Sequence, residues 1–141
     1  MSAHSIFWPG FALAAITFVV WIRMYTDRVG EMKAKRIHPQ KVASRVQAAQ
    51  LLSNTKALDH YSNLFETPVL FYFTLVVIAV AKLDQSVLLP MAWAFVAARA
   101  IHAFIHVTYN KVWHRFYAFL ISCIALWLFM AYAAWLLGQQ A

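Results

Sequence analysis

Charged residues are scarce in this chain, and acidic residues are the scarcest of them. Of 141 residues only 12% are charged, with five Asp and Glu against twelve Lys and Arg, while 63% are apolar. A soluble domain has about a quarter charged and about half apolar residues, so this composition excludes an ordinary soluble protein. Cysteine occurs once, at Cys123, which excludes a disulfide framework within the chain. The length suits one domain covering residues 1–141.

The positive net charge of +7 does not indicate nucleic-acid binding. The Lys and Arg residues lie in short segments between long apolar runs, a pattern typical of membrane topology. Nucleic acid is therefore not an expected partner, whereas a lipid bilayer is.

Four apolar runs have the length, or nearly the length, of a membrane-spanning helix, which needs about 20 residues. They predict helices at residues 6–24, 60–81, 87–109 and 115–137. The later runs are joined by short connections, so consecutive helices should be antiparallel. The sequence thus predicts an all-α fold, an integral membrane four-helix up-and-down bundle, with one long basic connection at 25–59.

Lys and Arg are distributed very unequally between the two sides of this predicted bundle. Residues 23–60 and 110–115 hold ten of the twelve, and the opposite side holds only Lys82. Because basic residues remain on the cytoplasmic side, we expect loops 25–59 and 110–114 to be cytoplasmic and both termini to be non-cytoplasmic. No basic residue precedes Arg23, so the first run lacks the charged start of a cleaved signal peptide. The prediction is a multi-pass protein, with a bacterial inner membrane as its expected location.

The long basic connection contains a segment with amphipathic spacing. Apolar residues recur among polar ones between residues 40 and 58, which favours a helix near the lipid headgroups. Its cations can bind anionic lipid, or some of them can form the rim of a site for an anionic ligand. The sequence leaves both interpretations open.

Ionisable side chains interrupt the third run. Arg99, His102 and His106 recur at i, i+3 and i+7, which places them on one face of a helix, and Tyr109 follows. Such groups normally face the interior of a bundle or a wet cavity. Arg115 opens the fourth run at the same edge of the membrane.

The second run carries Asn63 and Glu66, three residues apart, at its expected cytoplasmic start. Since the second and third helices should be antiparallel, Glu66 and Arg99 can lie at a similar depth and neutralise each other. Pro68 cannot donate a hydrogen bond to Leu64 and should kink this helix. The polar residues then form either a pocket open to the cytoplasm or a device that holds helices or subunits in register. A haem site using His60 with His102 or His106 is a third interpretation.

The polar residues also form a recognisable motif. It consists of Asn63-Leu64-Phe65-Glu66-Thr67-Pro68, Arg99-Ala100-Ile101-His102, and Arg115 sixteen residues after Arg99. Together with the four-run topology, which covers essentially the whole chain, this motif resembles the MAPEG family, membrane-associated proteins in eicosanoid and glutathione metabolism. The string from Arg99 to Asn110 resembles the bacterial, mostly uncharacterised branch of that family.

The resemblance implies a homotrimer with glutathione between neighbouring subunits, open to the cytoplasm. It places Arg115 at the position of the arginine that stabilises the glutathione thiolate. His106 stands where some members have a tyrosine, and Tyr109 is one turn away, so both belong to the candidate pocket. The residues that match the family's glutathione-binding positions are Asn63, Glu66, Arg99 and His102. Glutathione is then a co-substrate, and no metal is expected.

The expected function is that of a membrane-bound glutathione-dependent transferase or peroxidase acting on a lipophilic small molecule. Ser62 and Phe116 depart from residues typical of some members, so a dedicated eicosanoid synthase is not expected. A cation of the first connection, Lys35 or Arg36, can complete the site. Two alternatives remain: a non-enzymatic family member whose polar cluster is structural, and a haem-binding electron-transfer protein.

Overall fold

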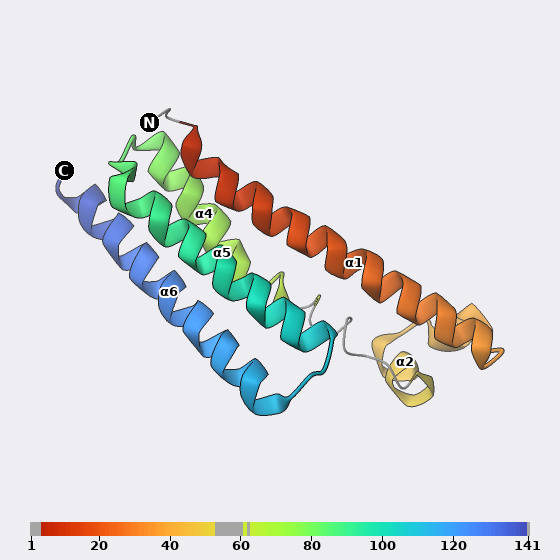
Figure 1. Cartoon of the computed structure of the whole chain (residues 1–141). Coiled ribbons are helices and arrows are strands. Elements are labelled where there is room, and N and C mark those ends of the chain that lie inside the picture. Colours follow the sequence, from red (N-terminus) through yellow and green to blue (C-terminus); the bar gives the residue numbers. More distant parts are fainter. Residues whose placement is uncertain (1–3, 53–60, 62, 141) are drawn as a thin grey trace.

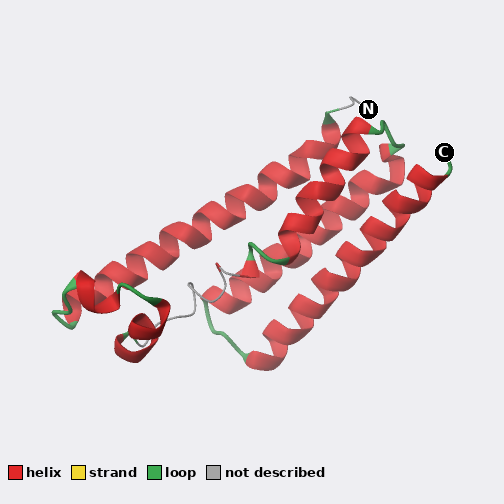
Figure 2. Ribbon diagram, turned by 180° about the vertical axis from the view of Figure 1, so that it is seen from behind, coloured by secondary structure: helices red, strands yellow, loops and turns green. Residues whose placement is uncertain are grey.

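The computed structural model describes residues 4–52, 61 and 63–140, and every regular element in these ranges is helical (Figure 2). Three helical segments among them are long and apolar enough to cross a membrane, namely Ser5–Ala34, Gln85–Val107 and Val112–Gly138. The apolar helix α4, Thr67–Val80, has 14 residues and is shorter than a full span. An all-helical membrane protein is therefore confirmed, whereas a bundle of four spanning helices stays a prediction.

The long helices run up and down beside one another (Figure 1). Helix α1, Trp8–Ala34, starts at the end where α4 is joined to α5, Gln85–Val107, and where α6, Val112–Gly138, finishes. We call this the terminal end, because both ends of the chain lie there. The opposite end carries the last turns of α1, the short helix α2, Arg45–Leu51, and the α5–α6 connection. We call it the basic end.

Helix α1 continues ten residues beyond its expected end at residue 24, into the segment predicted as a loop from 25 to 59. The apolar run marks where the membrane should end, but the residues that follow still favour a helix. Arg23 pairs with Asp27 at 3.2 Å and Glu31 with Lys35 at 2.6 Å, both at the i, i+4 spacing that supports exposed helices. The helix stops only where Arg36 adopts a positive φ of 52° ahead of a 3₁₀ turn at Pro39–Val42.

The segment after α1 folds back onto it. Helix α2 begins with a capping box between Ser44 and Gln47. Buried Val42, Ala48 and Leu52 form a small apolar cluster on which Met32 and Ile37 pack. The predicted amphipathic helix within residues 40–58 is therefore present over Arg45–Leu51, and its residues 53–58 lie outside the described part of the chain.

The second predicted helix, 60–81, is interrupted: Tyr61 and Asn63 are helical, residues 64–66 are not, and the apolar helix α4 begins at Thr67. Pro68 occupies the first turn of α4, where its missing N–H costs nothing, so it begins a helix here and does not kink one. Before it, Leu64 closes a turn by donating its N–H to the carbonyl oxygen of Tyr61 at 3.2 Å. The chain therefore breaks just ahead of Pro68, and carbonyl groups in the break are available to other partners.

Helices α5 and α6 lie within three residues of the predicted boundaries of 87–109 and 115–137. Helix α5 ends two residues early because Asn110 takes a left-handed conformation, with φ of 50°, and donates its N–H to the carbonyl of Ile105. Asparagine accepts this conformation more readily than most residues, which makes it a good helix terminator.

The main apolar core lies toward the terminal end. Three phenylalanines are fully buried there, namely Phe71 of α4, Phe95 of α5 and Phe129 of α6. The ring centroid of Phe71 is 4.6 Å from that of Phe95 and 5.6 Å from that of Phe129. Gly10 of α1 lies against Leu75 so closely that an added Cβ would be 2.9 Å from its Cδ1. Glycine therefore allows α1 and α4 to make close contact at this end.

The predicted membrane orientation can be tested with two matched exposed glutamines, Gln139 at the terminal end and Gln40 at the basic end. Each is replaced by cysteine in a background where Cys123 is alanine. The Gln139→Cys protein should react with an impermeant thiol reagent added to intact cells, and the Gln40→Cys protein should react only after lysis. Labelling of the Gln40→Cys protein alone in intact cells would mean that the orientation is reversed.

Candidate functional site

A fully buried arginine lies in the middle of the candidate site. Arg99 has 0% of its surface exposed, on a face of α5 that points into the bundle. Its Nη2 donates a hydrogen bond of 2.9 Å to the backbone carbonyl of Asn63, in the break ahead of α4. Among the residues that the structure describes, its Nε and Nη1 have no hydrogen-bond partner. Arg99 thus ties α5 to the start of α4 and keeps donor capacity for another group.

The two histidines predicted on the same face are also buried there. His102 and His106 are 1% and 2% exposed, and their ring centroids are 5.7 Å apart. Phe119 of α6 covers this layer: its ring centroid is 5.6 Å from that of His102 and 5.8 Å from the Cζ atom of Arg99. The ring faces a cation at a distance where cation–π attraction operates. The i, i+3, i+7 spacing of Arg99, His102 and His106 is thus confirmed as one buried face.

Arg115, in the first turn of α6, is fixed by two side chains from the end of α5. Its Nη1 donates to Oδ1 of Asn110 at 3.0 Å and approaches Nε2 of His106 at 3.4 Å. The second contact is a hydrogen bond when His106 carries its ring proton on Nδ1. Both contacts use the same nitrogen, and the side chain is only partly buried. We call Arg99, His102, His106, Asn110 and Arg115 the polar cluster.

Two predicted site residues lie apart from this cluster in the single subunit. Glu66 is exposed, and the hydrogen bond that the structure gives Arg99 goes to Asn63 and not to the Glu66 carboxylate, which attracts Arg99 only through space. The predicted neutralisation of Arg99 by Glu66 therefore involves no direct contact in the single subunit, where residues 64–66 leave the helix before Pro68.

Tyr109 is 51% exposed, and its hydroxyl lies 3.2 Å from Nδ1 of His114. It does not continue the face of His102 and His106, because α5 ends at Val107. Lys35, a candidate cation from the first connection, is engaged by Glu31 and by the carbonyl of Leu51. His60, required for the haem interpretation, lies outside the described residues.

Comparison with known proteins decides the family. A model of the MAPEG family matches residues 6–135, nearly the whole chain. This chain belongs to the MAPEG family. A comparison with curated proteins found no match, and neither did a comparison with solved structures.

The polar cluster of this MAPEG protein is suited to an anionic ligand. It contains two guanidinium groups and two imidazoles, and Glu66, whose carboxylate attracts Arg99 through space, is exposed. Arginine binds carboxylates through paired hydrogen bonds and also stabilises a neighbouring thiolate. Within the described ranges, no group of three or more His, Cys, Asp or Glu residues is arranged to hold a metal ion.

The roles of two residues in this arrangement were not predicted from the sequence, although Asn110 was noted after Tyr109 at the end of the third run. Asn110 orients Arg115, and its signal was an asparagine directly after a long apolar run, where helices often end. Phe119 covers Arg99 and His102, and it lies one helical turn after Arg115. The sequence gives no signal for Phe119, because α6 contains many other aromatic residues.

Proposed function

We propose that this chain is a membrane-bound glutathione-dependent transferase or peroxidase that acts on a lipophilic substrate as a homotrimer of four-helix subunits. Membership of the MAPEG family supports glutathione as the thiol substrate. The observation that carries the proposal is Arg115, a partly buried guanidinium fixed by Asn110 and His106 beside a buried arginine. A cation held in advance of the reaction is the feature that thiolate stabilisation requires.

In this proposal the site is open to the cytoplasm, and its residues are Asn63, Glu66, Arg99, His102, His106 and Tyr109 with Arg115. Glutathione carries two carboxylates and one ammonium group. The carboxylates would be bound by the positive side chains, and the ammonium by Glu66, whose exposure in the single subunit leaves it accessible to a ligand at a subunit boundary.

Arg115 is proposed to lower the pKa of the glutathione thiol and so increase the thiolate fraction. In conjugation the thiolate sulfur attacks an electrophilic carbon, a C–S bond forms, and the leaving group departs with the bonding electrons. In peroxide reduction two glutathione molecules are oxidised to the disulfide, while the hydroperoxide is reduced to an alcohol and water. Both reactions need the same thiolate, so the polar cluster alone does not select between them.

The first test is binding and turnover by protein purified in detergent. Glutathione binding is measured by calorimetry, conjugation with an aryl halide acceptor, and peroxide reduction with a lipid hydroperoxide. We expect saturable glutathione binding and thioether or disulfide formation above the uncatalysed rate. Absence of binding would contradict the proposal.

The alternative, a non-enzymatic family member, is favoured by one observation. Arg99 is fully buried and already bonded to the Asn63 carbonyl, as expected of a residue that links helices. Glutathione binding without measurable turnover of either acceptor would support this alternative.

A further inference from the structure

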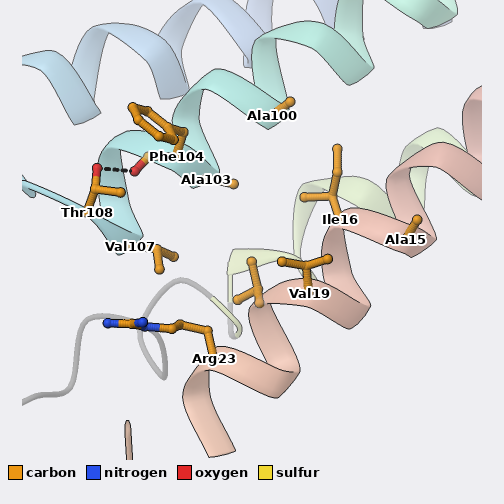
Figure 3. A pocket seen from close by; sticks show the side chains of 10 residues that line it. Ala15, Ile16, Val19, Arg23, Ala100, Ala103, Phe104, Val107 and Thr108 are labelled. Carbon is orange, nitrogen blue, oxygen red and sulfur yellow. Dashed lines mark hydrogen bonds between the residues drawn. The ribbon is translucent and has the colours of Figure 1, made fainter. Parts of the chain in front are cut away.

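A second, apolar site lies between α1 and α5, away from the polar cluster. It is a groove of about 450 Å³ whose described lining residues come from these two helices only (Figure 3). Ala15 of α1 and Ala100 and Ala103 of α5 lie on its walls. Because these side chains are small, the two helices leave the space between them open.

The basic end of the groove is closed by a cation. Figure 3 shows Arg23 reaching from α1 past Val107 toward the last turn of α5. Its Nε contacts the Asp27 carboxylate at 3.2 Å, and its side chain remains 56% exposed. The terminal nitrogens of the guanidinium lie beyond this contact and can bind a further oxygen acceptor. The groove is thus apolar along its length, and the guanidinium of the Arg23–Asp27 ion pair stands at its basic end.

Aromatic side chains place this cation near the surface of the membrane. Trp21 and Tyr25, on either side of Arg23 along α1, are exposed and stacked with ring centroids 6.2 Å apart. Tryptophan and tyrosine concentrate at the level of lipid headgroups. Arg23 therefore lies at headgroup level, and the groove extends from there into the hydrocarbon region.

The groove is long and narrow. From Ala15 to Arg23 it follows eight residues of α1, roughly 12 Å at the rise of an α-helix. Its volume of about 450 Å³ then corresponds to a mean cross-section of roughly 40 Å². A single flexible chain can follow a groove of this length and width.

We propose that the groove binds one acyl chain of an anionic phospholipid from the leaflet at the basic end, with the lipid phosphate beside Arg23. With Arg23 at headgroup level, the groove would run beside the upper acyl chains, and the exposed Arg23 guanidinium would complement the phosphate. This site does not depend on glutathione binding at the polar cluster. A bound phospholipid would fill the space between α1 and α5 that protein side chains leave open.

The proposal is tested by native mass spectrometry on delipidated protein given equal amounts of an anionic phosphatidylglycerol and a zwitterionic phosphatidylcholine. The wild type should retain one phosphatidylglycerol per subunit. Ala100→Phe fills the groove and should reduce retention at least tenfold, and Val19→Trp should do the same from the α1 side. The matched control is Ala94→Phe, an exposed alanine of α5 outside the groove, which should retain lipid as the wild type does.

The role of the charge is tested separately. Arg23→Gln should reduce the preference for the anionic lipid about fivefold, the effect of one cation at the membrane surface. Lys33→Gln removes the same charge from an exposed site farther along α1 and should leave the preference unchanged. The proposal is overturned if Ala100→Phe and Ala94→Phe retain equal amounts of phosphatidylglycerol. It is also overturned if Arg23→Gln and Lys33→Gln show the same preference for the anionic lipid, or if the protein retains a free fatty acid in place of phospholipid.

Discussion

Arg115→Ala is expected to reduce glutathione turnover by about 100-fold or more, the usual effect of removing a fixed group that stabilises developing negative charge. The variant should assemble normally and bind glutathione only modestly more weakly, because Arg115 is fixed by Asn110 and His106 and does not link distant helices. The measurement is specific activity per correctly folded oligomer, with binding determined on the same preparation.

Two companion variants separate catalysis from topology. Arg115→Lys should recover only part of the rate, because an ammonium group lacks the planar geometry that lets one nitrogen contact Asn110 while others face the thiolate. Lys111→Ala removes an exposed cation from the same connection and should keep wild-type activity. If Arg115→Ala and Lys111→Ala both insert less efficiently but keep full specific activity, Arg115 is a determinant of topology and not of catalysis.

Arg99→Ala is expected to lower the free energy of unfolding in detergent by roughly 3–5 kcal/mol. It removes a fully buried side chain, leaves the Asn63 carbonyl without its donor, and exposes a cavity beneath Phe119. Arg99→Met should cost less, because an apolar side chain of similar length fills the space without a buried charge. Thermal unfolding in detergent measures both.

The same experiment tests the role of Glu66. Since this carboxylate is exposed, Glu66→Ala should cost less than about 1 kcal/mol on its own. If instead it destabilises the assembly as much as Arg99→Ala does, and the double variant is no worse than either single one, the two side chains pair directly in the oligomer. Ile101→Ala, an exposed position two residues along α5, is the matched control and should have little effect.

The helix ends that the sequence predicted best are those set by a capping side chain or by an asparagine in a left-handed conformation. Helix α5 lies within two residues of its predicted bounds, because Asp84 caps its start and Asn110 ends it. Helix α1 was underestimated because hydropathy reports where lipid ends, whereas Arg23–Asp27 and Glu31–Lys35 continue the helix into water. Pro68 was predicted to kink a helix, but it lies in the first turn of α4 and marks the start of that helix.

The site residues on helix α5 were predictable from the sequence, whereas the contacts that join this helix to its neighbours were less so. Helical periodicity alone placed Arg99, His102 and His106 on one buried face. The hydrogen bond from Arg99 to the Asn63 carbonyl was not predicted, because a backbone carbonyl next to an irregular segment leaves no trace in side-chain patterns. The contacts of Arg115 were likewise not evident, because Asn110 reaches it only through a left-handed turn.

The uneven burial along the bundle has a mechanical consequence. At the terminal end, Gly10 brings α1 against α4, and thirteen buried apolar residues form one continuous core. Toward the basic end, the corresponding cluster has three buried residues within the described ranges, Val20, Leu64 and Ala103. Helices in a bilayer are held together by close packing and not by the hydrophobic effect. We therefore expect the helices to part most easily toward the basic end, beside the polar cluster and the groove, where a ligand or lipid has to enter.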